Sequence, residues 1–169
     1  MRRPLAAALA GGAVLVLGSA ALAVDNTYLA SHLNGGEEVP VRETRATGTA
    51  VFKLSDDGTE LTYRLIVANI DNVIAAHIHV GAAGANGPVV AFLFGPAAAG
   101  GGGANGVLAT GTITAANLVG PLAGHSLSDL VAAIESGNAY VNVHTNDGIG
   151  EINTGPGDFP GGEIRAPME

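Results

Sequence analysis

The feature that most constrains the fold of this chain is a series of short segments, β-branched or alternating in polarity, separated by clusters of Gly, Pro, Asn and Asp. Such segments favour β-strands, and the clusters favour turns. Asp57-Gly58 lies between two of them, and Asp-Gly readily adopts the positive φ of a tight hairpin turn. Eight strands are predicted: Thr27–Leu33, Thr47–Leu54, Glu60–Ile70, Val73–Val80, Val89–Phe94, Val107–Ile113, Ala139–Thr145 and Gly162–Arg165.

Strands of this number and length predict an all-β sandwich or barrel. One short helix interrupts the pattern, because Leu127, Leu130, Val131 and Ile134 recur at helical spacing. Ser126 can cap its N-terminus. We therefore expect an all-β domain crossed by one amphipathic helix.

The segment Gly95–Gly106 has low complexity and contains four consecutive glycines. We expect a mobile surface loop here, because ordering glycines costs much backbone entropy. No Lys-Ser or Lys-Thr follows the glycines, so the segment does not fit a phosphate-binding loop.

The first residues predict export. Arg2 and Arg3 precede an apolar stretch, Leu5–Leu17, and small residues then lead to Ala23. This order is typical of a secretory signal peptide over residues 1–23. An uncleaved anchor helix is the alternative, but the apolar stretch is shorter than the roughly 20 residues that span a bilayer. We expect a secreted, periplasmic or extracellular protein that has no membrane segment after cleavage.

Cleavage would leave one domain, residues 24–169, that is strongly acidic. The whole chain has 7 basic and 15 acidic residues, and the leader holds two of the basic ones, so the mature net charge is 5 − 15 = −10 with histidine neutral. Such a surface repels nucleic acid. The chain has no cysteine, so its stability must come from its core or from a bound ion rather than from disulfides.

Two histidines one residue apart, His77 and His79, are predicted to lie on one face of a strand, since residues two apart on a strand point to the same side. Tyr140, Asn142 and His144 share one face of another predicted strand. If the two strands are neighbours with these faces aligned, His77, His79 and His144 converge. Three imidazoles with an open position suit zinc or copper.

The alternative interpretation is that these histidines pack or bond to carbonyl groups and bind no ion. Under the metal hypothesis, affinity is expected to fall as the pH drops through ~6.5, where a free histidine protonates. His32 and His125 are weaker candidates, the first as a surface residue and the second as a residue beside the helix cap.

Other polar residues have structural interpretations. Glu37 and Glu38 are expected in a solvated turn, and Glu163 and Arg165 are expected to share a strand face and to pair across the sheet. The Asp-rich and Asn-rich segment Asn146–Gly162 offers oxygens for calcium, but its acidic residues do not follow the spacing of a helical calcium loop.

Five motifs lie along the chain: Asn34–Pro40, His77-Ile78-His79, Gly84–Val90, Tyr140–Thr145 and Gly162–Arg165. Together they resemble the CHRD domain, the module that is repeated in the extracellular protein chordin and occurs singly in secreted bacterial proteins. The resemblance covers about residues 26–165 and implies an extracellular β-sandwich module without implying a defined activity.

A fainter resemblance concerns the copper side of copper–zinc superoxide dismutase, in which a His-x-His strand and a distant histidine bind the metal. The resemblance implies that His77, His79 and His144 stand for copper ligands. The chain differs from that enzyme because it lacks the cysteine pair and an evident zinc-binding cluster of His and Asp.

These observations favour a secreted CHRD-like module with an immunoglobulin-like or superoxide-dismutase-like Greek-key β-sandwich. The leading hypothesis is a binding module, not an enzyme, with a three-histidine site for copper or zinc. One alternative is a structural or adhesive extracellular module that binds a protein partner through a sheet face or edge without metal. The other is a copper-dependent redox enzyme.

Overall fold

The structure, a computed structural model, describes residues 26–169, so the predicted signal peptide lies outside the described residues. This part of the chain forms eight strands and one α-helix, α1 (Leu127–Glu135), together with three short 3-10 helices. The strands are β1 (Thr27–Asn34), β2 (Thr47–Leu54), β3 (Leu61–Asp71), β4 (Val73–Val80), β5 (Val89–Phe94), β6 (Gly103–Ile113), β7 (Ala139–Thr145) and β8 (Ile164–Pro167).

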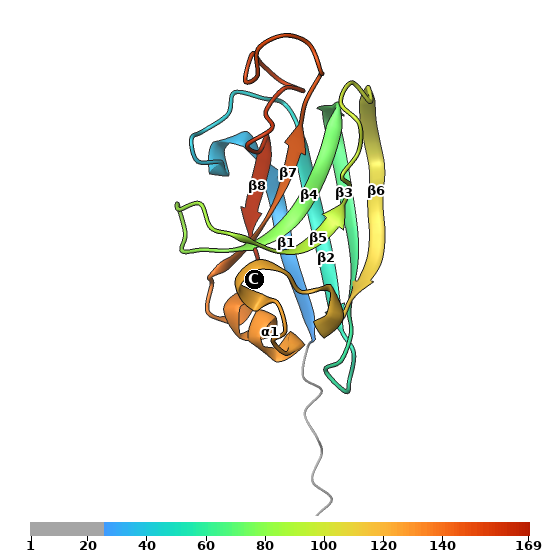
Figure 1. The fold of residues 1–169 in the computed structure, drawn as a ribbon, viewed down its shortest axis with the longest axis vertical. Helices are drawn as coiled ribbons and strands as arrows, with labels where there is room; N and C mark the ends of the chain where they lie inside the picture. Colours follow the sequence, from blue (N-terminus) through green and yellow to red (C-terminus); the bar gives the residue numbers. More distant parts are fainter. Residues whose placement is uncertain (1–25) are drawn as a thin grey trace, which may run out of the picture.

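The eight strands form one antiparallel sheet in the order β5-β4-β7-β8-β1-β2-β3-β6. The sheet folds on itself so that β5-β4-β7-β8 lies against β1-β2-β3-β6 (Figure 1). At the join, β8 and β1 share the single residue pair Asn34 and Arg165. On the opposite side the two edge strands approach each other, and the Tyr63 hydroxyl of β3 donates to the Leu93 carbonyl of β5 at 2.7 Å. The predicted antiparallel, sandwich-like all-β fold with one helix is confirmed.

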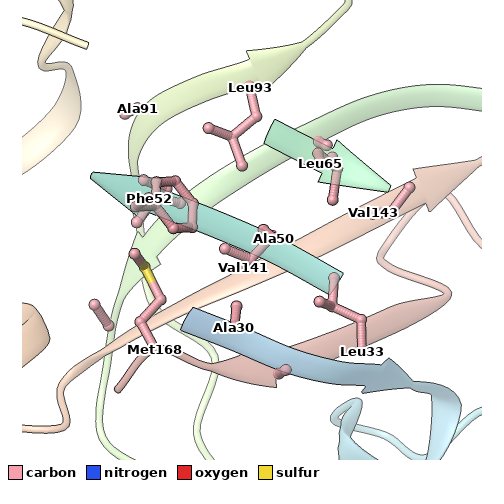
Figure 2. Packing of buried hydrophobic residues seen from close by; sticks show 14 of the residues in the cluster. Ala30, Leu33, Ala50, Phe52, Leu65, Ala91, Leu93, Val141, Val143 and Met168 are labelled. Atoms are coloured by element: carbon pink, nitrogen blue, oxygen red, sulfur yellow. The ribbon is translucent and has the colours of Figure 1, made fainter. Parts of the chain in front are cut away.

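The core lies between the two layers. Figure 2 shows Phe52 and Leu65 of one layer close to Val141 and Val143 of the other. All four side chains are fully buried. Because residues alternate along β7, burying these valines turns Tyr140, Asn142 and His144 to the outer face of the layer.

The helix forms where the sequence predicted it. The Asp129 carboxylate accepts from both the backbone N–H and the hydroxyl of Ser126, which closes the first turn. Leu127, Leu130 and Ile134 are buried, and Figure 1 shows the helix at one end of the sandwich. Within residues 26–169, no helix combines the length and the apolar character needed to cross a membrane.

The glycine-rich segment is more ordered than expected. Strand β6 begins at Gly103, which pairs with Asp71 of β3, so the predicted loop through Gly106 is wrong for its last residues. Just before it, the Gly102 N–H donates to Oδ1 of Asn72, and the Asn72 N–H donates to the Gly102 carbonyl, at 2.9 and 2.8 Å. These bonds tie the glycines to the turn between β3 and β4.

Candidate metal centre

Strands β4 and β7 bring the three predicted histidines together. The two strands pair antiparallel, with His79 opposite Tyr140 and His77 opposite Asn142. His144 lies one strand step further along the same face of β7. One ring nitrogen from each histidine lies within 4.8 Å of the others. The convergence expected from strand alternation is thus present, while the binding of an ion by these residues remains a prediction.

Backbone carbonyls determine which ring nitrogen of two histidines carries the proton. His79 donates from Nδ1 to the Gly87 carbonyl at 2.8 Å, and His144 donates from Nδ1 to the Pro160 carbonyl at 2.9 Å. Nε2 of each ring therefore carries a lone pair. Nε2 of His144 accepts from Nδ1 of His77 at 3.0 Å. In metal sites, proteins usually orient a histidine ligand by bonding the ring nitrogen that does not bind the metal, as the Gly87 and Pro160 carbonyls do here with Nδ1.

Nε2 of His79 is buried and has no hydrogen-bond partner. The whole residue is only 8% exposed, so water has little access to this lone pair. A buried lone pair without a donor costs free energy, unless a cation or a proton donor occupies the space in front of it.

Burial also keeps the three rings neutral. Desolvation, with a smaller contribution from the neighbouring imidazoles, lowers the pKa of His77 and of His144 to about 4. Burial is also the main cause that lowers the pKa of His79. We therefore expect protonation to compete with metal binding at a lower pH than the ~6.5 of a free histidine.

The loop between β4 and β5, residues 81–88, packs beside His79 and accepts its Nδ1 hydrogen bond. Tyr140 stacks on the His79 ring with centroids 4.8 Å apart and planes 11° from parallel. The Tyr140 hydroxyl accepts from the Gly87 N–H at 2.9 Å. Arg165 places its guanidinium 3.4 Å from the centre of the Tyr140 ring and donates to the Ala85 carbonyl at 2.7 Å. One loop is thus fastened to both strands that carry the candidate ligands.

Gly87 can only be glycine in this geometry. A Cβ atom on Gly87 would overlap the Val80 carbonyl. The close approach of the two backbone segments brings the Gly87 carbonyl within reach of His79. On the other side of the centre, Phe92 contacts His77 edge-on, with the ring centroids 4.7 Å apart. Because Phe92 is 49% exposed, it forms the boundary between the centre and solvent.

Glu38 is buried, which contradicts the expectation of a solvated turn. It is 3% exposed because residues 35–46 fold back onto the outer face of the sheet, where Asn86 of the β4–β5 loop donates to the Val39 carbonyl at 2.8 Å. Figure 1 shows both segments on the same side of the molecule. Burial raises the pKa of Glu38 to about 7, although the positive charge of Arg165 opposes this shift.

Glu163 and Arg165 are both buried, and their side chains bond to different loops instead of forming the expected pair. The Glu163 carboxylate accepts from the hydroxyls of Thr44 and Thr145, each at 2.6 Å, and from the Gly157 N–H at 2.9 Å. Glu163 therefore fixes the long β7–β8 loop that supplies the Pro160 carbonyl, while Arg165 donates a hydrogen bond to the β4–β5 loop.

The two weaker candidates do not join the cluster. His32 is exposed and lies in a β-bulge of β1 with φ of 58°. His125 is exposed and lies 3.4 Å from the Asp129 carboxylate. Among the described residues, the three histidines of β4 and β7 form the group of His, Asp or Glu with metal-binding spacing.

The acidic residues of the β7–β8 loop bond to the loop itself rather than gathering as calcium ligands. Asp147 accepts from the Ile149 N–H at 2.8 Å. Asp158 accepts from the backbone and the hydroxyl of Thr154 at 2.9 and 2.8 Å. This pattern gives the calcium interpretation no support.

Sequence reasoning missed four residues around the histidines: Glu38, Gly87, Asn142 and Pro160. Asn142 had a signal, since it shares the polar face of its strand with His144. The others act through loop carbonyls or through burial by distant loops, and no local pattern predicts either.

The comparisons with known proteins agree with the resemblance seen in the sequence. The sequence profile of the CHRD domain matches residues 29–167, which is nearly the whole described chain. A search of curated proteins and a search of solved structures found no match to this chain. On the strength of the profile match, the chain belongs to the CHRD domain family.

Proposed function

We propose that this CHRD domain is an exported binding module that holds one copper or zinc ion through His77, His79 and His144. The observation that carries the proposal is the buried, unpartnered Nε2 of His79, which lies beside two further neutral imidazoles. A metal ion would accept this lone pair and so give the buried nitrogen the partner that it lacks.

The donor set fits this class of ion. Neutral imidazoles suit zinc and copper, whereas calcium and magnesium prefer oxygen ligands. Two of the three rings already present Nε2 because their Nδ1 atoms are held by carbonyls. Binding would exchange the hydrogen bond between His77 and His144 for bonds to the ion. As a bound ion, copper or zinc would add Lewis acidity at this surface.

Metal content tests the proposal. Protein purified from the compartment into which it is exported should contain about one copper or zinc ion per chain by elemental analysis. The triple His77→Ala/His79→Ala/His144→Ala variant should contain none. His125→Ala and His32→Asn serve as matched controls and should retain the ion; asparagine is chosen at position 32 because it tolerates a positive φ.

The two alternatives give different results. A purely adhesive module predicts equal, negligible metal in the wild type and in the triple variant. A redox enzyme predicts the same metal content as our proposal, together with catalysed superoxide loss that the triple variant lacks. Export is tested separately by mass spectrometry, since cleavage of residues 1–23 leaves Val24 as the first residue of the secreted protein.

A further inference from the structure

A second buried polar atom beside the histidines lacks a partner, and it belongs to Asn142. This residue is 4% exposed, and its carbonyl oxygen Oδ1 accepts no hydrogen bond. Asn142 lies opposite His77 in the register of β4 and β7, and it shares the outer face of β7 with His144. The unpartnered oxygen therefore belongs to a residue on the same outer face as the three candidate ligands.

The orientation of the Asn142 amide follows from its neighbours. Its side chain bonds to the Glu38 carboxyl and favours the charged form of that group, which requires the amide N–H to face Glu38. The amide oxygen is then turned toward the His79 ring, with which the Asn142 side chain interacts. Even so, neither Nε2 of His79 nor Oδ1 of Asn142 has a hydrogen-bond partner. Two lone pairs thus lie side by side in a buried space.

We propose that Oδ1 of Asn142 is the fourth donor of the metal centre, so that three imidazole nitrogens and one amide oxygen surround a divalent ion. This inference rests on the proposed function and deepens it. Two donors that bind one zinc ion at roughly 2.0–2.2 Å must lie close to each other. Nε2 of His79 and Oδ1 of Asn142 meet this condition, because the two side chains interact. Glu38 acts as a positioning residue that holds the amide with its oxygen toward the ion.

An amide oxygen also selects among ions. Carbonyl oxygen is a hard donor that stabilises divalent ions, and it adds little to copper(I), which prefers soft ligands. The inferred donor set therefore favours zinc or copper(II) over copper(I).

The test compares the affinities of the full exported chain for zinc and for copper(I), each measured against a competing chelator. Asn142→Leu keeps a side chain of similar size and removes the oxygen. Zinc affinity should fall by about tenfold or more, as for other losses of metal-supporting groups, while copper(I) affinity should change by less than about threefold. Asn142→Asp supplies a charged oxygen at the same place and should bind zinc more tightly than the wild type.

The control is Asn138→Leu, the same substitution at an exposed position near the start of β7, which should leave both affinities unchanged. The melting curve of metal-free Asn142→Leu should stay cooperative, because leucine fills a similar buried volume, although the substitution also removes the amide N–H that faces Glu38.

Two results would overturn the inference. One is equal zinc affinity in the wild type, Asn142→Leu and Asn142→Asp. The other is a parallel loss of zinc and copper(I) affinity in Asn142→Leu, which marks a distorted histidine frame rather than a lost oxygen. A wild type that binds neither ion refutes the proposed function itself, so the two failures are distinguishable.

Discussion

At the scale of single residues, the outer face of β7 holds polar groups whose protonation depends on burial. His144 is 9% exposed and Asn142 is 4% exposed, and Glu38, from a distant segment of the chain, interacts with Asn142. Burial disfavours the charged form of each titratable group, so it lowers the pKa of the histidines and raises that of Glu38. The same cause therefore has opposite consequences for stability as the pH changes.

Glu38→Gln should reveal the cost of burying this carboxyl. The pKa of Glu38 is about 7 in the folded protein against 4.5 as its ordinary value, so its favourable contribution is present below about pH 4.5 and is lost as the pH rises through 7. Glutamine does not titrate. In metal-free protein, the free energy of unfolding of the wild type should therefore fall relative to the variant between pH 4.5 and pH 7.5. Denaturant melts at several pH values measure this, and a pH-independent difference would contradict it.

Zinc binding should persist in mildly acidic solution. The pKa of His77 and of His144 is about 4, so these rings remain neutral at pH 5.5, where a free histidine is mostly protonated. Zinc affinity should change by less than about threefold for each unit of pH between 7 and 5.5, and decline more steeply as the pH approaches 4. Competition titrations with a fluorescent chelator measure this, and a steep loss centred on pH 6.5 would show that the rings are not held neutral.

At the scale of elements, the strands were predictable and the loops were not. Alternation along β4 and β7 predicted that Ile78, Val141 and Val143 lie on the faces opposite the histidines, and burial of these residues produces that arrangement. The sequence did not predict that β4 and β7, which are separated by more than fifty residues, pair with each other. The predicted convergence of the histidines assumed that pairing. The burial of Glu38 and the carbonyl of Pro160 depend on loops that pack across the sheet, and local sequence does not encode those contacts.

The glycine-rich segment offers a test at the same scale. Deletion of Gly100–Gly103 removes both hydrogen bonds between Gly102 and Asn72 and the first residue of β6. At about 1 kcal/mol for each bond, the melting temperature should fall by ~5 °C or more. Gly101→Ala is the control, since a Cβ there would make only an ordinary van der Waals contact with the Ala98 carbonyl oxygen at 4.0 Å, and it should melt like the wild type. Equal melting of the deletion variant and the wild type would restore the mobile-loop interpretation.

At the scale of the whole molecule, the fold uses one face of each layer for the core, and the candidate metal centre lies on the outer face of β5-β4-β7-β8. Three segments cover that face: residues 35–46, residues 81–88 and the β7–β8 loop. With no cysteine in the chain, a bound ion would link β4 to β7 without a disulfide.

Metal should therefore stabilise the whole domain. An ion that binds only the folded state at a hundred times its dissociation constant adds about 2.7 kcal/mol. For a domain of this size the melting temperature should rise by roughly 5–10 °C. Melting curves of metal-free protein with increasing zinc measure this rise. The His77→Ala/His144→Ala variant is the control, and an equal rise in that variant would place the ion elsewhere.

Calorimetric titration of metal-free protein with zinc and with copper at pH 7 tests the central claim most directly. Wild-type protein should bind one ion per chain at saturation, and each single change among His77→Ala, His79→Ala and His144→Ala should weaken binding strongly. The double change His77→Ala/His144→Ala should cost less than the sum of its two single changes, because one lost ligand already disrupts the shared centre. Absence of a saturable site for either ion in the wild type would contradict the account, and His77, His79 and His144 would then be buried strand residues joined only by hydrogen bonds.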